Sequence, residues 1–402
     1  MITFLEYVFW ISCIVIFYNY AGYAILAYLY NKLIKRPGHK AASDYLPSVS
    51  FIVAAFNEED CIEEKIINSL DQDYPPDKIE FIFITDGSND NTPGIISKYP
   101  SIQLLHSPER KGKSAALNRA VSFAKHEILL FCDANTVLNK AATRYVTRHY
   151  SDKKVGGVAG EKKVMADKNA KEDVGSSEGL YWKYESLLKK IDSEFYSVVG
   201  AAGELFSVRR NLYENVEDQV ILDDFVISMK VAQHGYRIVY EPEAYAMELP
   251  SFSIKDEKKR KVRIAAGGFQ AMLMLPEALY FWRNPKLTFL YISHRVLRWT
   301  LSPISLILAF LSSLFLCFGT EMVIYKIFFG LQVVFYACGL LAQLFPILTN
   351  KIKLIKLPYY FIFMNISVIQ GFYRFLRRKQ PSTWEKVKRS NSNLVENQVL
   401  DT

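Results

Sequence analysis

The sequence has little cysteine, and what it has is scattered. Its 402 residues include five cysteines, Cys13, Cys61, Cys132, Cys317 and Cys338, and no two of them form a Cys-x-x-Cys pair. Neither a zinc site nor a disulfide framework is therefore indicated. A reducing compartment suits cysteines of this kind.

The chain also lacks a nucleic-acid-binding signature, although its net charge is +8. The basic residues gather beside apolar segments, as in Lys258–Lys261. Basic clusters next to a membrane attract anionic lipid head groups. We therefore assign the positive charge to the membrane surface and expect membrane lipids, and no nucleic acid, as partners.

A long apolar stretch near the start predicts a transmembrane helix. Residues 3–29 contain one acidic residue and no other charge, and they are long enough to cross a hydrocarbon core of about 30 Å. The stretch lacks the basic start and small-residue cleavage site of a signal peptide. Lys32, Lys35 and Arg36 follow it, which places the next domain in the cytoplasm. We expect residues 1–45 to form this helix and a linker.

The C-terminal part of the chain is apolar again. Residues 264–298 mix small, aromatic and basic residues, which is typical of interfacial helices. Residues 299–376 are predicted to be a C-terminal transmembrane region, and residues 377–402 a basic, polar cytoplasmic tail. Its last apolar stretch, 357–376, is shorter and carries polar side chains, so a span or a re-entrant or interfacial course is open for it. We expect a multi-pass protein of the inner (plasma) membrane.

Residues 46–263 have the pattern of an α/β domain. Short, β-branched apolar runs alternate there with stretches of helical periodicity. The runs are 49–55, 79–85, 102–105 and 127–132. Nearly continuous hydrophobicity is typical of parallel strands covered on both faces, so we predict a doubly wound sheet. In such a sheet the ligand lies beyond the carboxyl ends of the strands.

Polar residues follow the first two runs at that edge. The first run reaches Ala54 and is followed by Asn57 and Glu58, and all three are candidate substrate-binding residues; taken alone, Asn57 is better interpreted as the cap of the next helix. The second run is followed by Asp86 and then Gly87, which allows close backbone approach. A carboxylate here can accept hydrogen bonds from a nucleotide, although Asp86 and Gly87 alone also fit an ordinary turn.

The fourth run is followed by a second acidic motif. Asp133 comes directly after it, and Asn135 two residues later. Their hard oxygen atoms suit a divalent ion that bridges two phosphates. Asp133 alone also fits a helix cap. Because Asp133 and Asp86 follow strands of one sheet, we predict that they face one nucleotide pocket.

Between these motifs, Gly112-Lys113-Ser114 resembles the end of a phosphate-binding loop. That motif requires glycine where this chain has Ser107, so a backbone cradle for phosphate is not predicted. Lys113 is expected to supply positive charge near the pocket, at the start of a helix. Arg110 and Lys111 are interpreted as solvated charges.

Two adjacent carboxylates, Asp223 and Asp224, open a later helical stretch. Acidic residues in a first helical turn interact favourably with the helix dipole, so one of them fits a capping role. Asp224 is then the candidate general base, and Asp223 a candidate substrate-binding residue.

Taken in order, these motifs resemble the family 2 glycosyltransferases over residues 49–268. The stretches that carry the resemblance are Ala54–Glu58, Asp86–Ser88, Gly112–Asn118, Asp133–Asn135, Asp223–Asp224 and Arg263. The membrane context is similar to that of the synthases of cellulose, hyaluronan and poly-N-acetylglucosamine. The resemblance implies a GT-A (Rossmann-like) fold, a nucleotide-diphosphate sugar donor, usually UDP-linked, a bound Mg²⁺ or Mn²⁺, and inversion at the anomeric carbon.

The resemblance also implies roles for individual residues. Asp86 would contact the nucleotide base, with Ala54 and Glu58 nearby. Asp133 and Asn135 match the family's Asp-x-Asp motif, in which the first acid faces the donor and the last position holds the metal. A neutral amide therefore stands at the metal-binding position of this chain.

On the acceptor side, Asp224 matches the second acid of the family's Thr-Glu-Asp motif, the base that takes a proton from the acceptor hydroxyl. Gly203 and Glu204 resemble the acceptor-binding stretch, although an ordinary turn fits them equally. Both are candidate substrate-binding residues.

The Gln-x-x-Arg-Trp motif of the family is only partly present. Arg263 remains, and it is expected to neutralise the departing diphosphate; membership of the membrane-facing basic cluster is the alternative. Arg260, also a candidate substrate-binding residue, replaces the glutamine, and Ile264 replaces the tryptophan. The aromatic platform for an acceptor sugar is missing, which argues against processive polymerisation.

The sequence therefore predicts an inverting glycosyltransferase (a hexosyltransferase) at the cytoplasmic membrane face. It would move a sugar from a nucleotide-diphosphate sugar to a lipid-linked or saccharide acceptor, in the synthesis of cell-surface polysaccharide or glycan. One alternative is a processive synthase that also translocates its polymer. An alternative of another class is a non-catalytic scaffold or transporter with a degenerate nucleotide-binding domain.

Overall fold

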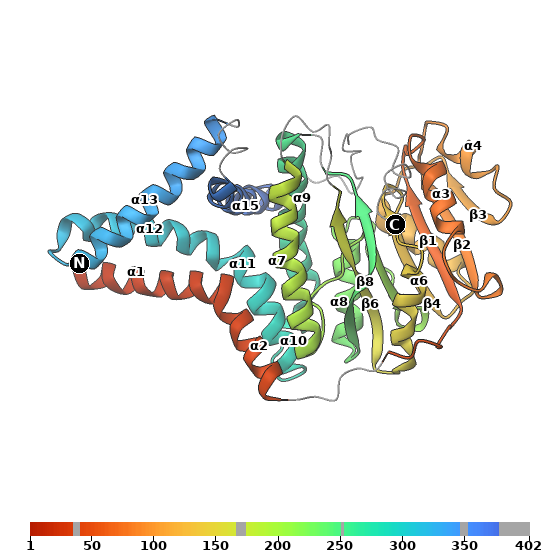
Figure 1. Cartoon of the computed structure of the whole chain (residues 1–402), viewed down its shortest axis with the longest axis horizontal. Helices are drawn as coiled ribbons and strands as arrows, with labels where there is room; N and C mark the ends of the chain where they lie inside the picture. Colours follow the sequence, from red (N-terminus) through yellow and green to blue (C-terminus); the bar gives the residue numbers. More distant parts are fainter. Residues whose placement is uncertain (35–40, 166–173, 251–252, 346–352, 378–402) are drawn as a thin grey trace.

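The computed structural model describes residues 1–34, 41–165, 174–250, 253–345 and 353–377. An α/β domain lies beside a group of long apolar helices, and helices α7 (Val174–Phe195) and α9 (Ile254–Met274) stand between the two (Figure 1). From residue 378 onward, the predicted tail lies outside the described residues, as do residues 35–40 of the predicted linker.

Eight strands form the sheet of the α/β domain. They are β1 (Val49–Ala55), β2 (Ile79–Asp86), β3 (Ile102–Ser107), β4 (Ile128–Asp133), β5 (Val137–Leu138), β6 (Val155–Val164), β7 (Leu205–Arg209) and β8 (Arg237–Glu248). Their order is β3-β2-β1-β4-β7-β6-β8-β5. β1 pairs in parallel with β2 and β4, and β2 with β3, whereas β7 runs antiparallel to both β4 and β6.

The GT-A-like fold is confirmed, but the sheet is mixed rather than wholly parallel. The four strands predicted from the sequence form one parallel part of it, and β6 and β8 also pair in parallel. β7 is almost entirely buried, as a parallel strand would be, yet it enters beside β4 from the opposite direction. Continuous hydrophobicity reports that a strand is covered on both faces, and it carries no information about direction.

The register of the parallel strands brings the predicted motifs to one edge. Asp133, the last residue of β4, lies opposite Ala54 of β1. The next residue of β1, Ala55, lies opposite Thr85 of β2, so Asp86 follows at the same level. The carboxyl ends of β1, β2 and β4 therefore open towards one site.

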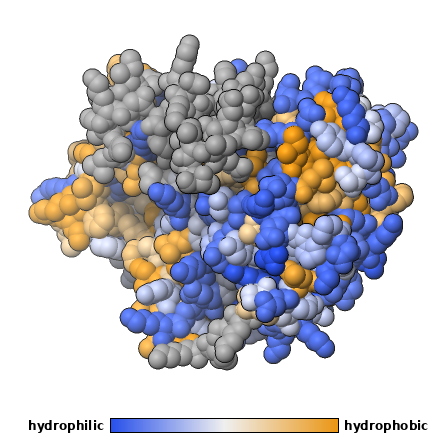
Figure 2. All heavy atoms as spheres, turned by 45° about the vertical axis from the view of Figure 1, so that its right-hand side comes forward, coloured by the Kyte–Doolittle hydropathy of each residue, from blue (hydrophilic) through white to orange (hydrophobic). Residues whose placement is uncertain are grey.

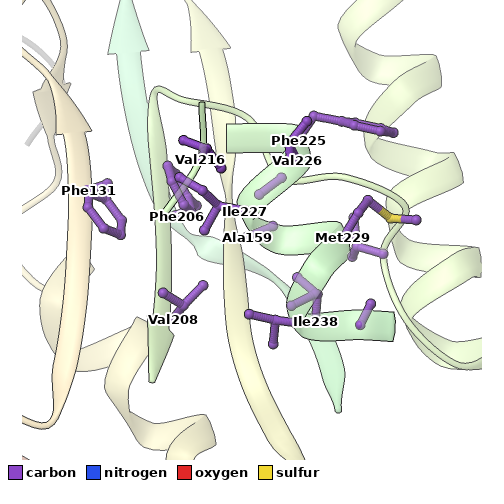
Figure 3. Close-up of a cluster of buried hydrophobic side chains, with 14 of the residues drawn as sticks. Phe131, Ala159, Phe206, Val208, Val216, Phe225, Val226, Ile227, Met229 and Ile238 are labelled. Atoms are coloured by element: carbon purple, nitrogen blue, oxygen red, sulfur yellow. The ribbon is translucent and has the colours of Figure 1, made fainter. Parts of the chain in front are cut away.

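A buried apolar cluster fixes helix α8 (Asp223–Gln233) against the middle of the sheet. Phe131 of β4 stacks on Phe206 of β7, with ring centroids 4.8 Å apart. Ile227 and Met229 of α8 are buried in the same cluster, as Figure 3 shows. This packing holds the first turn of α8, with its two acidic residues, in a fixed position.

Smaller helices complete the α/β domain and its membrane side. They are α3 (Ile62–Leu70), α4 (Thr92–Ile96), α5 (Lys113–Phe123), α6 (Ala142–Thr147), α10 (Pro285–Tyr291) and α11 (Leu297–Trp299). Short 3-10 turns cover Pro76–Lys78, Arg148–Ser151, Arg210–Leu212 and Pro276–Leu279, and single π-helical turns cover Tyr18–Gly22 and Ile292–Val296.

Three helices in the described part of the chain are long and apolar enough to cross a membrane. They are Ile2–Leu33, which comprises α1 (Ile2–Phe17), a π-helical turn and α2 (Tyr23–Leu33), and then α12 (Leu301–Gly319) and α13 (Val323–Leu344). Their side chains are largely exposed, and Figure 2 shows hydrophobic atoms gathered on their side of the molecule. A bilayer is the natural environment for such a surface.

Helix α15 (Lys353–Leu376) is not one of these three helices, and it packs closely on α9. A Cβ atom built on Gly371 would lie 2.5 Å from Ala265 Cβ and 2.9 Å from the backbone nitrogen of Ala266. Only glycine permits this approach. The domain boundary expected between residues 263 and 264 falls inside α9, which continues through it without a break.

Candidate functional site

Asp86 organises the loop that leads to Lys113. Its side chain is buried, and its two carboxylate oxygens accept hydrogen bonds from the backbone N–H groups of Lys111 (2.9 Å) and Gly112 (2.7 Å). Gly87 follows with φ of +70°, and a Cβ atom there would lie 2.6 Å from Arg110 Cβ. Glycine is therefore required at this turn.

Asn57 does not cap a helix, so that interpretation is wrong. Helix α3 begins four residues beyond Glu58, and Asn57 has φ of 54°. Its side chain donates to Asn89 Oδ1 (2.7 Å) and accepts from the Asn89 backbone N–H (2.9 Å). The backbone N–H of Glu58 donates to Thr92 Oγ1 (2.9 Å). Asn57 and Glu58 thus join the loop after β1 to the loop after β2.

Arg110 is exposed, as the sequence had indicated, but its side chain also packs on an aromatic ring. Its guanidinium carbon lies 3.6 Å from the ring centroid of Phe56, the residue directly after β1. A cation over an aromatic face is attracted by the ring quadrupole. Arg110 and Phe56 therefore form a wall beside Gly87. The aromatic residue at the strand end was the sequence signal for it.

Lys113 is the charged centre of the site. Its ammonium lies 2.7 Å from Asp133 Oδ1 and 3.8 Å from Asp223 Oδ2. Burial acts to lower the pKa of Lys113, but Asp133, Asp223 and Asp224 together hold that pKa well above its usual range. Burial also raises the pKa of Asp133, against the lowering effect of Lys113. Lys113 is therefore a fixed cation among acidic groups.

Gly203 leaves room for three of these side chains to converge. A Cβ atom there would lie 3.1 Å from Lys113 Nζ, 3.3 Å from Asp224 Oδ2 and 3.7 Å from Asp133 Oδ1. Even a methyl group would press against the lysine and the acids. Gly203 therefore borders the predicted site, and its lack of a side chain leaves space for the charged groups there.

Asp224 has the protonation behaviour of a general base. Burial, with the neighbouring Asp223 carboxylate, raises the pKa of Asp224 to about 7, although Lys113 opposes the shift. Its Oδ1 accepts a hydrogen bond from the backbone N–H of Phe225 (2.8 Å), so Oδ2 points towards Gly203. Asp223 is buried, and among the described residues it forms an ion pair with Lys113. A base near pH 7 is well matched to proton removal from a hydroxyl.

Glu204 and Arg260 lie in a buried ionic network. Lys162 contacts Glu204 Oε1 (2.6 Å) and also pairs with Glu248. Burial acts to raise the pKa of Glu204, but Lys162 holds it below its ordinary value. Arg260 contacts Glu257 (3.0 Å) and reaches towards Glu248 (3.8 Å). Arg260 is thus held by carboxylates.

Arg263 differs from Arg260 in its partners. Within the described residues it forms no ion pair with a carboxylate, and it is only partly exposed. Burial lowers its pKa; Asp223 acts to raise it, and Arg374 of α15 acts to lower it. The guanidinium of Arg263 is therefore close enough to Asp223 and Asp224 to interact with them electrostatically, and it can still bind an anion.

The oxygen atoms present fit a divalent ion only when a ligand completes its coordination. No group of three His, Cys, Asp or Glu side chains among the described residues could hold a metal. Asp133 gives one oxygen to Lys113 and retains the other, and Asn135 lies two residues beyond. Mg²⁺ is commonly bound by one or two protein oxygens together with substrate phosphates. Asp133 and Asn135 fit that arrangement.

A cavity of about 1000 Å³ adjoins Asp224 and continues between the membrane helices. Ile264 lines it, at the position where the motif tryptophan is replaced. Tyr181 and Trp182 of α7 line the same cavity. Sequence reasoning missed these aromatic residues, because α7 has no motif and its cavity-facing side was unknown.

Comparison with known proteins agrees with this fold. Residues 50–217 match the model described as glycosyl transferase family 2. The chain is similar to poly-β-1,6-N-acetyl-D-glucosamine synthases of Staphylococcus aureus (30% identity over 241 residues) and Staphylococcus epidermidis (27% over 245 residues). It spans 57% and 58% of those two proteins, and the matches cover 57% and 58% of this chain.

A solved structure is similar over nearly the whole chain. It is the mannosyltransferase PcManGT from Pyrobaculum calidifontis in complex with GDP-Man and Mn²⁺, with a TM-score of 0.70 and 22% identity. The match covers 94% of this chain and 100% of that one. At this identity the likeness shows the fold alone.

Proposed function

Because residues 50–217 match the glycosyl transferase family 2 model, we propose that the chain belongs to this family and transfers a sugar, with inversion, from a nucleotide-diphosphate sugar to a lipid-linked or saccharide acceptor. The observation that carries this proposal is the position of Asp224. It lies where the Lys113–Asp133 cluster meets the cavity between the membrane helices, and its pKa is about 7.

The donor binds at the carboxyl ends of β1, β2 and β4. Asp86 and the loop that it fixes face the nucleotide, and Asp133 faces the sugar diphosphate. The donor is a nucleotide-diphosphate sugar, which we propose to be UDP-linked; the similar structure from Pyrobaculum calidifontis holds GDP-Man and Mn²⁺. In this chain Asp133 and Asn135 would hold Mg²⁺ or Mn²⁺, which neutralises diphosphate charge when bound.

The acceptor hydroxyl approaches Asp224 from the cavity. Asp224 removes its proton as the oxygen attacks the anomeric carbon from the face opposite the diphosphate. The bond to the diphosphate breaks as the new glycosidic bond forms. Arg263 then stabilises the negative charge on the departing diphosphate, and Lys113 contributes a second fixed cation. Asp223 holds Lys113 in place from the opposite side.

The orientation of the chain follows from its charges. Lys32 lies in the last turn of α2, between the membrane helix and the α/β domain. Basic residues at the end of a span favour the cytoplasmic side. We therefore place the catalytic domain at the cytoplasmic face of the plasma membrane.

A processive synthase is the second candidate function. Similarity to the staphylococcal synthases favours it, as does the continuity of the cavity with the membrane helices. The replacement of the motif tryptophan by Ile264 disfavours it. The length of the product separates the two functions.

The test uses the full chain, purified in detergent, with a panel of UDP- and GDP-linked sugars and Mn²⁺. We expect one donor to give metal-dependent nucleotide release, and Asp224→Asn to lower that rate at least about 1000-fold while donor affinity stays within a factor of about three. The matched control is Asp218→Asn, an exposed acid near the same helix. Full turnover by Asp224→Asn would remove Asp224 from the role of base.

A further inference from the structure

One face of helix α7 points into the cavity. Trp182, Glu185 and Lys189 recur at intervals of three and four residues, so they share a helical face, and all three line the cavity. Lys183 and Lys190 of the same helix are exposed instead. The cavity therefore receives one particular lysine of α7.

The ammonium of Lys189 is buried without a hydrogen-bond partner. The residue is 2% exposed, and no oxygen atom of the described residues accepts a hydrogen bond from Nζ. Two aromatic rings lie near it: Nζ is 5.7 Å from the ring centroid of Trp182 and 5.9 Å from that of Tyr240. A buried cation without an anionic partner is costly, which points to a ligand at this position.

The acidic side chains near Lys189 are bonded to other groups. Glu161 accepts hydrogen bonds from Ser186 (2.5 Å) and Tyr240 (2.6 Å). Glu185 pairs with Arg298 (2.5 Å) and Arg295 (3.2 Å). Glu204 pairs with Lys162. None of these three carboxylates forms an ion pair with Lys189. The ammonium of Lys189 can therefore still bind an anion.

The lining of the cavity carries more basic than acidic side chains, and the part of it between the membrane helices is apolar. Six Lys and Arg side chains line it, against three acidic ones, Glu185, Glu204 and Asp224. Between the membrane helices the lining is instead largely apolar or aromatic, for example Phe17 of α1 and Phe335 of α13. An amphipathic molecule with one anionic group matches both ends.

We propose that Lys189 anchors the phosphate group of a lipid-linked acceptor, with the hydrocarbon chain of that lipid lying between the membrane helices. This proposal rests on the proposed transferase function and names the acceptor class. Since Asp224 is placed to take a proton from a hydroxyl, the phosphate is the linkage group of the acceptor and the attacking atom is a hydroxyl oxygen farther along it. Trp182 and Tyr240 are positioning residues that hold the ammonium between two rings.

The test measures binding of a fluorescent phosphatidic acid to the full chain in neutral detergent. We expect saturable binding that unlabelled phosphatidic acid displaces, whereas diacylglycerol with the same acyl chains does not. Lys189→Met preserves side-chain length and should weaken binding by about 10- to 100-fold, because a charge-assisted hydrogen bond is lost. Lys189→Arg should retain binding, and so should Lys190→Met, the adjacent exposed lysine of α7.

Three outcomes would overturn the proposal. One is equal displacement by diacylglycerol, which shows that the phosphate is not recognised; this arm needs no variant and decides the matter even if Lys189→Met does not fold. A second is equal affinity of Lys189→Met and Lys190→Met for phosphatidic acid, in samples that still bind the nucleotide sugar. Displacement by a soluble N-acetylglucosamine hexamer, without displacement by phosphatidic acid, would assign the cavity to a saccharide chain and also overturn it. Lipid binding requires no turnover, so a failure here is distinguishable from a failure of the transferase function.

Discussion

Lys113 Nζ lies 2.7 Å from Asp133 Oδ1, and this pair joins the two halves of the candidate site. Asp133 ends strand β4 on the donor side, and Lys113 also reaches Asp223 of α8 on the acceptor side. The lysine therefore influences the protonation of Asp224 as well as the charge that faces the donor.

Replacing Lys113 by methionine should damage both sides of the site. We expect kcat/KM to fall at least about 100-fold, since a fixed cation beside the diphosphate is lost. Because Lys113 lowers the pKa of Asp224, the acid limb of the pH–rate profile should move to higher pH. Lys111→Met is the control, as the side chain of Lys111 is exposed and its ammonium pairs with Glu109, which is exposed as well. An unmoved acid limb would contradict this coupling.

The protonation of Asp224 predicts the pH dependence of the wild-type rate. The base acts when deprotonated, and its pKa is about 7. Below that pH, kcat should fall about tenfold for each pH unit. The measurement is kcat under saturating donor and acceptor from pH 5 to pH 9, and a flat profile between pH 5 and pH 7 would exclude a base of this kind.

The same carboxyl group should also affect stability. Its folded pKa is raised above the ordinary value of 3.8, so its favourable contribution is complete below that value and is lost as pH rises through about 7. Asp224→Asn cannot ionise, and it should therefore stabilise the protein more at pH 8 than at pH 4.5, by about 1.4 kcal/mol for each pH unit between pH 4.5 and about 7. Thermal unfolding of Asp224→Asn, Asp218→Asn and wild type at both pH values measures this; an equal gain at both would argue against the raised pKa.

Gly203→Ala tests the convergence of side chains on this position. The added methyl group would lie 3.1 Å from Lys113 Nζ and 3.3 Å from Asp224 Oδ2, so both side chains must shift. We expect a loss of about tenfold or more in kcat with little change in melting temperature. Gly179→Ala on α7, where a Cβ atom meets nothing within 4 Å, is the matched control. Equal activity of the two variants would show that Gly203 does not border the reacting groups.

Arg263→Gln separates a role in leaving-group stabilisation from a role at the membrane surface. Loss of a cation that acts on the departing diphosphate should lower kcat by about 100-fold and leave binding to anionic vesicles unchanged. Lys259→Gln, an exposed residue of the same helix, should do the opposite. Vesicle sedimentation and nucleotide release are the two measurements. Weakened vesicle binding with normal kcat in Arg263→Gln would favour the membrane alternative.

The sequence predicted the edge of the sheet well because strand ends carry a local signal. Asp86 and Asp133 each follow an apolar run, and the parallel pairing of those runs brings them together. Asn57 was misjudged because a left-handed residue and a helix cap favour the same amino acid. The side chain of Asn57 accepts a hydrogen bond from Asn89 instead of capping a helix, and Asn89 is distant in the sequence.

The acceptor side could not be predicted to the same extent. Lys189 and Trp182 belong to no motif, and their importance depends on which face of α7 meets the cavity. That face is set by packing of α7 against β6 and the membrane helices, a tertiary property. The direction of β7 was hidden for a similar reason, since burial on two faces is the same for either direction.

Helix α9 has a consequence for how the enzyme senses its surroundings. It is one uninterrupted helix of 21 residues, about 30 Å long. Arg263 lies in its middle, Gly268 packs on Trp299 of α11, and Ala265 packs on Gly371 of α15. A tilt of the helices in the lipid, such as a change in bilayer thickness imposes, would be transmitted along this helix to Arg263, which we propose to act on the donor phosphates. We therefore expect the rate of sugar transfer to change with the thickness of the host membrane.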